Sequence, residues 1–492
     1  MGIFSDSSDM PWFAFEPETF GFPGAYPVER WSAAQLQYAR AEMLVSGTAL
    51  DKRDERQDLP LYPEKVNLWD FVCEVHATML CGESGKTPQT LFTTSSGQRA
   101  RTRAAKYTAL LDSIVNKSDP ALFWTIFYNA NAYGGYGMIV RYNPGGEFPI
   151  IYEGVHPMSL YPVFDSQYRV IECFIHRIIT HSEARWVYGI EIPDNEIPHY
   201  VEYWNPDEYQ VKISQRVAKY KDGTQMQGDN PFKVAPVVYI PHLRKRSEWG
   251  VSQILGVGPL GLDFNARLAD VSDAVRDMAQ AQYWGFNVNQ PREMRLGRTV
   301  IWNVGDGYDP RAVPTITALQ APANVKDGKT AAEWLWNLVL HLSHIPGVAL
   351  GMDEGSQRSG ETLRARFWSL VAHCMVERLF ADSGLNQLAG IAVAGAQAIG
   401  LVSDGGLDDL RREQVWPDML PQERLELVNE MVTRRSAGLI GQRSAIEKFG
   451  DVRDVEQEMS DIQAEKQAAA AQAAAQSQPK ETQNDRKTRT DQ

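Results

Sequence analysis

The feature that most constrains the fold is a change in sequence periodicity near residue 131 and a second change near residue 245. Between these points, short runs rich in β-branched and aromatic residues alternate with turn-forming groups such as Asn-Pro-Gly-Gly and Lys-Asp-Gly. This alternation predicts a meander of strands. Because residues 31–130 and 251–284 have helical spacing instead, we expect an α+β protein. The strand-like runs are YGMIVRYN, FPIIYEGV, SLYPVF, YRVIECFIHRIIT, RWVYGIEI, PHYVEYWN, YQVKISQRV and PVVYIPHL.

The helical segment at 251–284 carries one apolar seam and one acidic row. The seam steps by four and three residues through Phe264, Leu268, Val271, Val275 and Met278, which indicates a single packed face. The acidic residues Asp263, Asp270 and Asp277 recur every seven residues on another face, with Asp273 beside them. Seven residues advance a helix by about 10 Å, too far for carboxylates to share a two-metal centre. We therefore interpret the row as a solvated face.

The rest of the chain alternates again. Residues 286–325 contain two strand-like runs around the turn GDGYDP, and a second helix is expected at 327–345. A glycine-rich break precedes a long helix that starts near Ser359, and the apolar run Leu388–Val402 predicts a buried helix that is too short to span a membrane. Another helix is expected between Pro421 and Gly438. The last thirty residues are low-complexity, and we expect their polar end to be disordered.

Composition excludes several classes of protein. A chain of 492 residues implies several domains or one segmented subunit. The net charge of −13 argues against tight binding of nucleic-acid phosphates. The four cysteines are scattered, so we expect neither a disulfide framework nor a zinc site, and the N-terminus lacks the features of a signal peptide.

The stretch GESGKT at 82–87 resembles the end of a phosphate-binding P-loop. That motif needs a further glycine five residues before Gly85, where this chain has Leu80. A P-loop also follows a buried strand, whereas the residues before Leu80 have helical spacing. We expect an ordinary surface loop and no bound nucleotide.

Other catalytic patterns are weak. His341 and His344 lie three residues apart on a predicted helix, but no third metal ligand is evident, so we expect ordinary packing. A pair of carboxylates for glycoside hydrolysis cannot be judged from sequence spacing. A carbohydrate-active hydrolase therefore stays open as an alternative.

The order of the segments resembles the portal proteins of tailed bacteriophages, which form the ring at one vertex of the capsid. Four stretches carry the resemblance, and the first hundred residues match least. They are NAYGGYGMIVRYNPGGEFPIIYEGVHPMSLYPVFD, PVVYIPHLRKRSEWGVSQILGVGPLGLDFNARLADVSDAV, HIPGVALGMDEGSQRSGETLRARFWSLV and RRSAGLIGQRSAIEKFGDVRDVEQEMSDIQAE.

The resemblance implies a non-enzymatic subunit with wing, stem, clip and crown parts and no cofactor. In this chain the implied division is as follows. It is 1–30 N-terminal arm, 31–247 first part of the wing, 248–285 first stem helix, 286–325 clip, 326–345 second stem helix, 346–360 tunnel loop, 361–415 long wing helix, 416–462 crown and 463–492 low-complexity tail.

The resemblance also assigns roles to three groups of residues, with no catalytic and no metal-binding residue among them. The acidic row Asp263, Asp270, Asp273 and Asp277 would line the channel and repel DNA phosphates. The tunnel loop would present Gly351, Asp353, Glu354, Gly355, Ser356, Gln357 and Arg358. The clip would bind successive partners through Arg292, Glu293, Arg295, Arg298, Asp306, Asp309 and Arg311, since charges at a rim steer association.

The expected assembly is a dodecamer of this chain in the virion, built in the host cytoplasm. Its implied partners are the large terminase, the head-tail adaptor, the major capsid and scaffolding proteins, and double-stranded DNA that passes without specific binding. No membrane is implied. Another oligomeric scaffold of the virion is the remaining alternative.

Overall fold

A computed structural model describes the chain in twenty ranges, and the chain divides into two units, Met1–Leu420 and Pro421–Gln492. The described ranges are 15–22, 26–51, 53–54, 59–60, 64–82, 88–142, 148–220, 223–245, 247–279, 282–287, 293–296, 299–303, 309, 311–319, 325–351, 360–402, 406–407, 409–420, 424–449 and 458–467.

The core of the first unit contains a three-stranded antiparallel sheet in the order β12-β4-β5. The middle strand is buried on both faces from residue 135 to residue 140, because helices and a second sheet cover it. Burial on both faces explains why its sequence is a nearly continuous apolar run. The strands are β4 (Gly135–Tyr142), β5 (Ile150–Val155) and β12 (Val237–Pro241).

The second sheet of this unit is antiparallel in the order β10-β9-β8-β7-β6, with β11 also paired to β9. The predicted meander is thus confirmed, split between two sheets. The N-terminal aromatic segment covers the second sheet, with the Phe15 ring 4.4 Å from Tyr161 and the Phe22 ring 5.3 Å from Phe174. The strands are β6 (Leu160–Phe164), β7 (Val170–Ile178), β8 (His199–Trp204), β9 (Glu208–Ile213), β10 (Arg216–Val217) and β11 (Gln227–Asp229).

One predicted strand is wrong. The run RWVYGIEI begins inside the helix α5 (His181–Trp186), and no strand covers its residues. The Thr180 side chain accepts a hydrogen bond from the backbone N–H of Glu183, 3.1 Å away. This cap starts a helix, and its sequence signature, a threonine three residues before a glutamate, outweighs the β-branched residues that follow.

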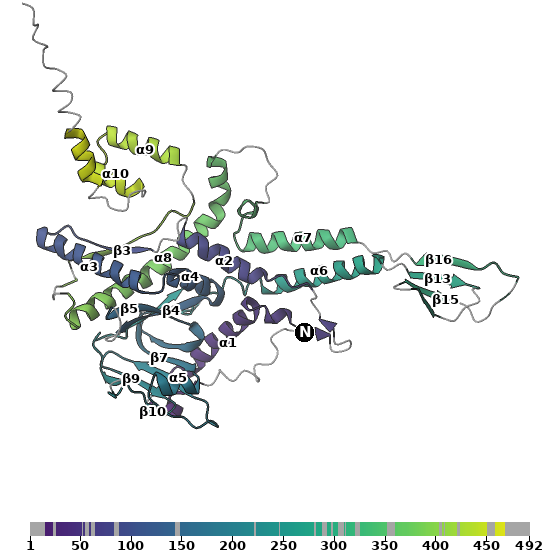
Figure 1. The fold of residues 1–492 in the computed structure, drawn as a ribbon, viewed down its shortest axis with the longest axis horizontal. Helices are drawn as coiled ribbons and strands as arrows, with labels where there is room; N and C mark the ends of the chain where they lie inside the picture. The colour runs from purple at the N-terminus through teal and green to yellow at the C-terminus, as the bar shows by residue number, and fades with distance from the viewer. Residues whose placement is uncertain are drawn as a thin grey trace, which may run out of the picture. The chain divides into compact units, whose positions relative to one another are not determined.

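Helices from both ends of the sequence pack around the three-stranded sheet (Figure 1). The long helix α8 contacts β12 and β4, while α4 contacts α2 and α1. α8 contains most of the predicted apolar run at 388–402, and Leu388, Ala392 and Val393 are buried in it. The helices are α1 (Val28–Val45), α2 (Leu68–Cys81), α3 (Gln98–Lys117), α4 (Leu122–Tyr133) and α8 (Gly360–Ala398).

Several short elements also belong to the first unit. A two-stranded sheet joins β3 (Gln89–Thr93) to β17 (Arg411–Val415), a pairing across more than 300 residues that the helical pattern of 31–130 did not predict. The others are β1 (Arg53–Asp54), β2 (Leu59–Pro60), η1 (Pro17–Phe20), η2 (Thr48–Leu50) and η3 (Pro157–Ser159).

The second unit is helical in its described part. It holds α9 (Arg424–Ser436), α10 (Gln442–Phe449) and a helix at 458–467, around an apolar hollow lined by Met431, Ile446 and Ile462. Gly438 has φ +72° two residues after α9, as the predicted glycine ending requires. In neither unit does any described helix combine the length and apolar character needed to cross a membrane.

Candidate functional site

Two helices from distant parts of the sequence pack against each other as a hairpin, α6 (Gly258–Ala279) and α7 (Val325–Leu342) (Figure 1). The rings of Phe264 and Trp336 face each other at 5.9 Å. Phe264 is buried, whereas Val275 is 50% exposed. The first half of the predicted apolar seam therefore packs as expected, and the second half leaves an apolar side chain in solvent.

The first turns of α6 are fixed to the rest of the unit by two close contacts. A Cβ atom on Gly261 would lie 2.6 Å from Cζ2 of the fully buried Trp69, so only glycine fits at this crossing with α2. The buried Asn265 accepts a hydrogen bond from the Val66 N–H at 2.8 Å and donates one to the Val66 carbonyl at 3.0 Å. The hairpin thus starts from a rigid base.

The acidic row lies on α6, with three of its side chains described and exposed. Asp263 is exposed in the second turn of the helix. Asp270 lies 3.1 Å from Arg267, and Asp273 lies 2.9 Å from Arg276. These arginines, which the sequence analysis did not consider, offset part of the negative charge of the face. Asp277 belongs to α6, but its side chain lies outside the described residues.

A small sheet occupies the segment between the two helices, in the order β14-β15-β13-β16. β13 pairs parallel to β15 and antiparallel to β16. We expected the first helix to reach residue 284, but α6 ends at Ala279 and β13 begins at Gln282, because sheet pairing recruits the aromatic segment that follows. The strands are β13 (Gln282–Phe286), β14 (Glu293–Leu296), β15 (Thr299–Asn303) and β16 (Thr315–Leu319).

The predicted partner-binding charges of this sheet are only partly described. Glu293 and Arg295 lie on β14, and Asp309 and Arg311 are exposed before β16. The Asp309 carboxylate accepts a hydrogen bond from the Arg311 N–H at 2.8 Å, so it shapes the turn. The other predicted charges lie outside the described residues. They are Arg292, Arg298 and Asp306.

The sheet also exposes apolar side chains that the sequence analysis missed. Phe286 is 62% exposed, Val313 is 80% exposed and Ile316 is 55% exposed. The register places Phe286 opposite Thr315 and Gly285 opposite Ile316, at one end of the β13–β16 pair. Strand alternation could have suggested that one face of the sheet is exposed, but not that these three described side chains are left uncovered by the described residues.

The glycine-rich break follows α7. Its described part is η4 (Gly347–Leu350), which ends at the exposed Gly351 with φ +67°, a conformation that favours glycine. The remaining predicted loop residues lie outside the described residues. They are Asp353, Glu354, Gly355, Ser356, Gln357 and Arg358.

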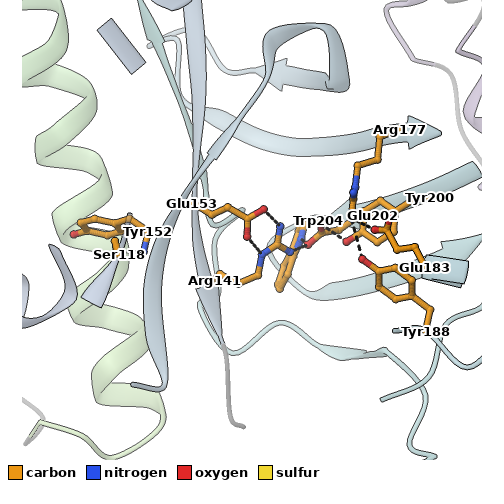
Figure 2. Close-up of polar contacts among 10 residues, drawn as sticks. All are labelled: Ser118, Arg141, Tyr152, Glu153, Arg177, Glu183, Tyr188, Tyr200, Glu202 and Trp204. Carbon is orange, nitrogen blue, oxygen red and sulfur yellow. Dashed lines mark hydrogen bonds and ion pairs between the residues drawn. The ribbon is translucent and has the colours of Figure 1, made fainter. Parts of the chain in front are cut away.

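A buried polar network connects the two sheets of the first unit, as Figure 2 shows. Arg141 on β4 pairs with Glu202 on β8 and, 3.0 Å away, with Glu153 on β5. Tyr200 and the Trp204 indole donate hydrogen bonds to Glu202 at 2.7 and 2.6 Å. Burial alone would lower the pKa of Arg141, but Glu202, Tyr200 and Glu153 together outweigh burial and hold that pKa well above its usual value.

The loop GESGKT follows a helix, as predicted, since α2 ends at Cys81. Residues 83–87 lie outside the described residues.

All four cysteines are free and buried. Of the two predicted neighbours in HLSH, His341 is exposed, while the His344 ring stacks on His373 at 4.3 Å.

His373 is part of a buried cluster with His76, His242 and Glu377 that the sequence analysis did not find. The one available signal was the spacing of His373 and Glu377, which lie four residues apart on one helix. His76 and His242 are distant in sequence, so only the fold brings them to that pair.

Comparison with known families agrees with this arrangement of helices and sheets. The family described as Phage portal protein, SPP1 Gp6-like, matches residues 116–472. Because this match covers more than half of the chain, the protein belongs to that family of phage portal proteins. No curated protein matches the chain. The family is a structural one whose members are multimeric components of the virion, and the mixed helices and sheets fit the expected α+β class.

Proposed function

We propose that this chain forms a dodecameric ring at one vertex of the capsid, through which DNA enters during packaging and leaves during ejection. The observation that carries the proposal is the α6–α7 hairpin with a small sheet inserted between its helices, within the segment that the portal family matches. In this proposal α6 and α7 are the stem, the sheet is the clip, α8 belongs to the wing and α9 and α10 belong to the crown.

Exposed apolar residues on these helices support assembly from many copies. Val275 on α6, Trp334 on α7 and Trp368 on α8 are 50–64% exposed. Exposed large apolar side chains that cluster on a protein surface commonly mark interfaces. In a ring each hairpin would lie beside the hairpins of two neighbouring subunits, which would cover Val275 and Trp334.

The acidic row would face the channel. Asp263, Asp270 and Asp273 are exposed, and phosphate is repelled by carboxylates across a water-filled bore. The pairing of Asp270 with Arg267 and of Asp273 with Arg276 makes this face weakly rather than strongly negative. A weakly repulsive wall suits DNA that must slide without being held.

The clip sheet would dock the large terminase during packaging and the head-tail adaptor afterwards. Its exposed Phe286, Val313 and Ile316 would supply buried contacts, and the charges around Asp309 and Arg311 would supply the polar rim. Residues 346–360, which include Gly351, would be the tunnel loop. Capsid and scaffolding proteins would surround the wing.

A carbohydrate hydrolase is the alternative from another class. One hollow of the first unit contains two carboxylates, Glu202 and Asp229. Both oxygens of Glu202 are already bound by Arg141, Tyr200 and Trp204. A carboxylate held in this way cannot serve as a general acid, so the hollow does not support hydrolysis.

The test is the mass of the purified chain by native mass spectrometry, with particle imaging. A closed ring of about a dozen copies with a central hole supports the proposal; a stable monomer that hydrolyses polysaccharide contradicts it. Deleting residues 351–358 should then leave the ring intact and impair DNA packaging. Collapse of the ring with normal packaging by the surviving particles would contradict the assigned loop.

A further inference from the structure

Three histidines from three separate elements surround one buried carboxylate. His76 lies on α2, His242 directly follows β12, and His373 lies one turn before Glu377 on α8. His76, His242 and Glu377 are at most 4% exposed. Ionisable groups are rarely buried together unless they are paired or bind a metal.

The three imidazoles converge on a single oxygen. Glu377 Oε1 lies 3.1 Å from His76 Nδ1, 3.3 Å from His242 Nε2 and 3.2 Å from His373 Nε2. Despite these distances, neither His242 Nε2 nor His373 Nε2 makes a hydrogen bond to any described residue. The two nitrogens therefore lie close to the oxygen without being directed at it.

The outer nitrogen of His242 fixes which of its ring atoms carries hydrogen. His242 Nδ1 lies 2.8 Å from the Val251 carbonyl, which can only accept, so Nδ1 is the donor. In the neutral imidazole Nε2 then carries a lone pair, and this nitrogen lies 3.3 Å from the carboxylate oxygen. Two lone pairs at 3.3 Å repel each other unless a positive charge lies between or beside them.

A metal ion satisfies all of these features at once. In tetrahedral zinc sites, bonds of about 2.0–2.1 Å place ligand atoms roughly 3.3 Å apart, which matches the two nitrogen–oxygen distances. The lone pairs then point at the ion rather than at each other. Ligating histidines also usually donate their other N–H to a carbonyl or carboxylate, as His242 does to Val251.

We propose that His242, His373 and Glu377 bind a divalent transition-metal ion of the zinc class. Their ligand atoms all lie within 4.8 Å of one another. Asn131 donates a hydrogen bond to the other oxygen of Glu377 at 3.1 Å and orients it. His76 Nδ1 lies 3.1 Å from the same carboxylate oxygen and neighbours the site without being one of its three ligands.

The ion would join α8 to the end of β12. Both elements belong to the core of the first unit, and two of the three ligands are buried with His373 only slightly exposed, so the ion would stabilise the fold rather than activate a substrate. Binding to the folded state alone raises stability. This role is independent of the proposed channel.

The test uses the full-length chain without an affinity tag. Apo protein, prepared with a chelator, is titrated with Zn²⁺ and then with Co²⁺, whose absorption bands report the coordination geometry. The proposal predicts about one tightly bound ion per chain, tetrahedral Co²⁺ bands and a melting temperature that falls on chelation. Binding of less than about one tenth of an ion per chain would overturn the proposal, if neither Zn²⁺ nor the chelator changes the melting temperature. The cluster would then be held together by protons shared between its side chains.

Variants distinguish binding of the ion at this site from adventitious binding elsewhere. His242→Gln and His373→Gln should each weaken Zn²⁺ binding by at least tenfold, the scale seen even for partners outside the ligand set. The matched control is His176→Gln, which removes a half-buried histidine of the second sheet and should leave one ion per chain. Equal Zn²⁺ binding by all three variants would contradict the assignment, and circular dichroism shows whether each variant is folded.

Discussion

Arg141 on β4 pairs with the fully buried carboxylate of Glu202 on β8, and this pair ties the three-stranded sheet to the six-stranded sheet (Figure 2). The two strands are not neighbours in any sheet. A buried ion pair is costly to form, but its directional hydrogen bonds admit only one relative placement of the sheets. We infer that the pair specifies this placement more than it adds stability.

Replacing one partner tests this relationship. Glu202→Gln should lower the free energy of unfolding by about 3–5 kcal/mol, because it leaves the Arg141 charge without its buried partner. Chemical denaturation followed by fluorescence measures the change. The control is Glu153→Gln, since that residue pairs with the same arginine but has a half-exposed side chain; a loss below about 1 kcal/mol is expected. Similar losses for both variants would contradict the inference.

The crossing of α6 and α2 should tolerate no side chain at Gly261. Gly261→Ala places a methyl group 2.6 Å from the Trp69 ring, and overpacking of this kind costs about 1–3 kcal/mol. Gly256→Ala is the control, because a Cβ there meets no atom within 4 Å. Thermal unfolding of the two variants compares them. If Gly261→Ala melts like the control, the base of the hairpin is looser than described.

Periodicity predicted the elements that neighbouring residues determine. Runs rich in β-branched and aromatic residues predicted the strands β4, β8 and β12, and segments of helical spacing predicted the helices α7 and α8. The pattern does not predict the short helix α5, because β-branched residues follow its capping pair, Thr180 and Glu183. The family resemblance rests on the order of these segments, and each segment can be recognised from its local sequence pattern.

What the sequence could not show depends on contacts between distant residues. β3 pairs with β17 across more than 300 residues, and neither strand has a pattern of its own. The acidic row on α6 was visible, but its pairing with Arg267 and Arg276 needed side-chain geometry. His242 and His373 are 131 positions apart by their numbers, so their shared neighbour Glu377 was invisible before the fold placed them together.

A pair of histidines in the second sheet should make the free energy of unfolding depend on pH. His176 Nε2 lies 3.0 Å from His199 Nδ1, with Phe15 stacked on His176. Burial, and then the nearby His199, lower the pKa of His176 to about 4, while an unfolded histidine titrates near 6.5. Between these values the unfolded chain binds more protons, so stability is lost as the pH falls from about 6.5 toward 4.

The measurement is the free energy of unfolding at several pH values for wild type and His176→Gln. One group contributes a slope of at most about 1.4 kcal/mol per pH unit, and this part should disappear in the variant. His181→Gln, at the start of α5, controls for the general effect of removing a histidine. Parallel pH curves for wild type and His176→Gln would show that the pair is not responsible.

The exposed apolar end of the small sheet should bind the packaging partner. Val313→Asp with Ile316→Asp should leave folding and ring formation intact, because both side chains are more than half exposed. Binding of the large terminase should fall by about tenfold or more. The reason is that replacing an apolar anchor at the centre of an interface commonly costs over 1 kcal/mol of binding free energy. Thr317→Asp, on the same strand, is the control. Pull-down of terminase with purified rings measures the difference.

The acidic row on α6 should matter for movement of DNA and not for folding. Changing Asp263, Asp270 and Asp273 to lysine replaces a weakly repulsive face with one that attracts phosphate, since Arg267 and Arg276 remain. Charge reversal of this size changes association rates by about tenfold or more. Rings should still form, but DNA should be retained, so complementation of a portal-deficient phage should yield about tenfold fewer filled heads.

The matched control places the same change elsewhere on the first unit. Asp194, Glu196 and Glu208 are exposed near the second sheet, and their triple lysine variant alters the net charge equally. If both variants reduce filled heads to the same extent, the effect follows from total charge and the acidic row does not line the path of DNA. If only the α6 variant does so while its rings have normal mass, the row faces the channel.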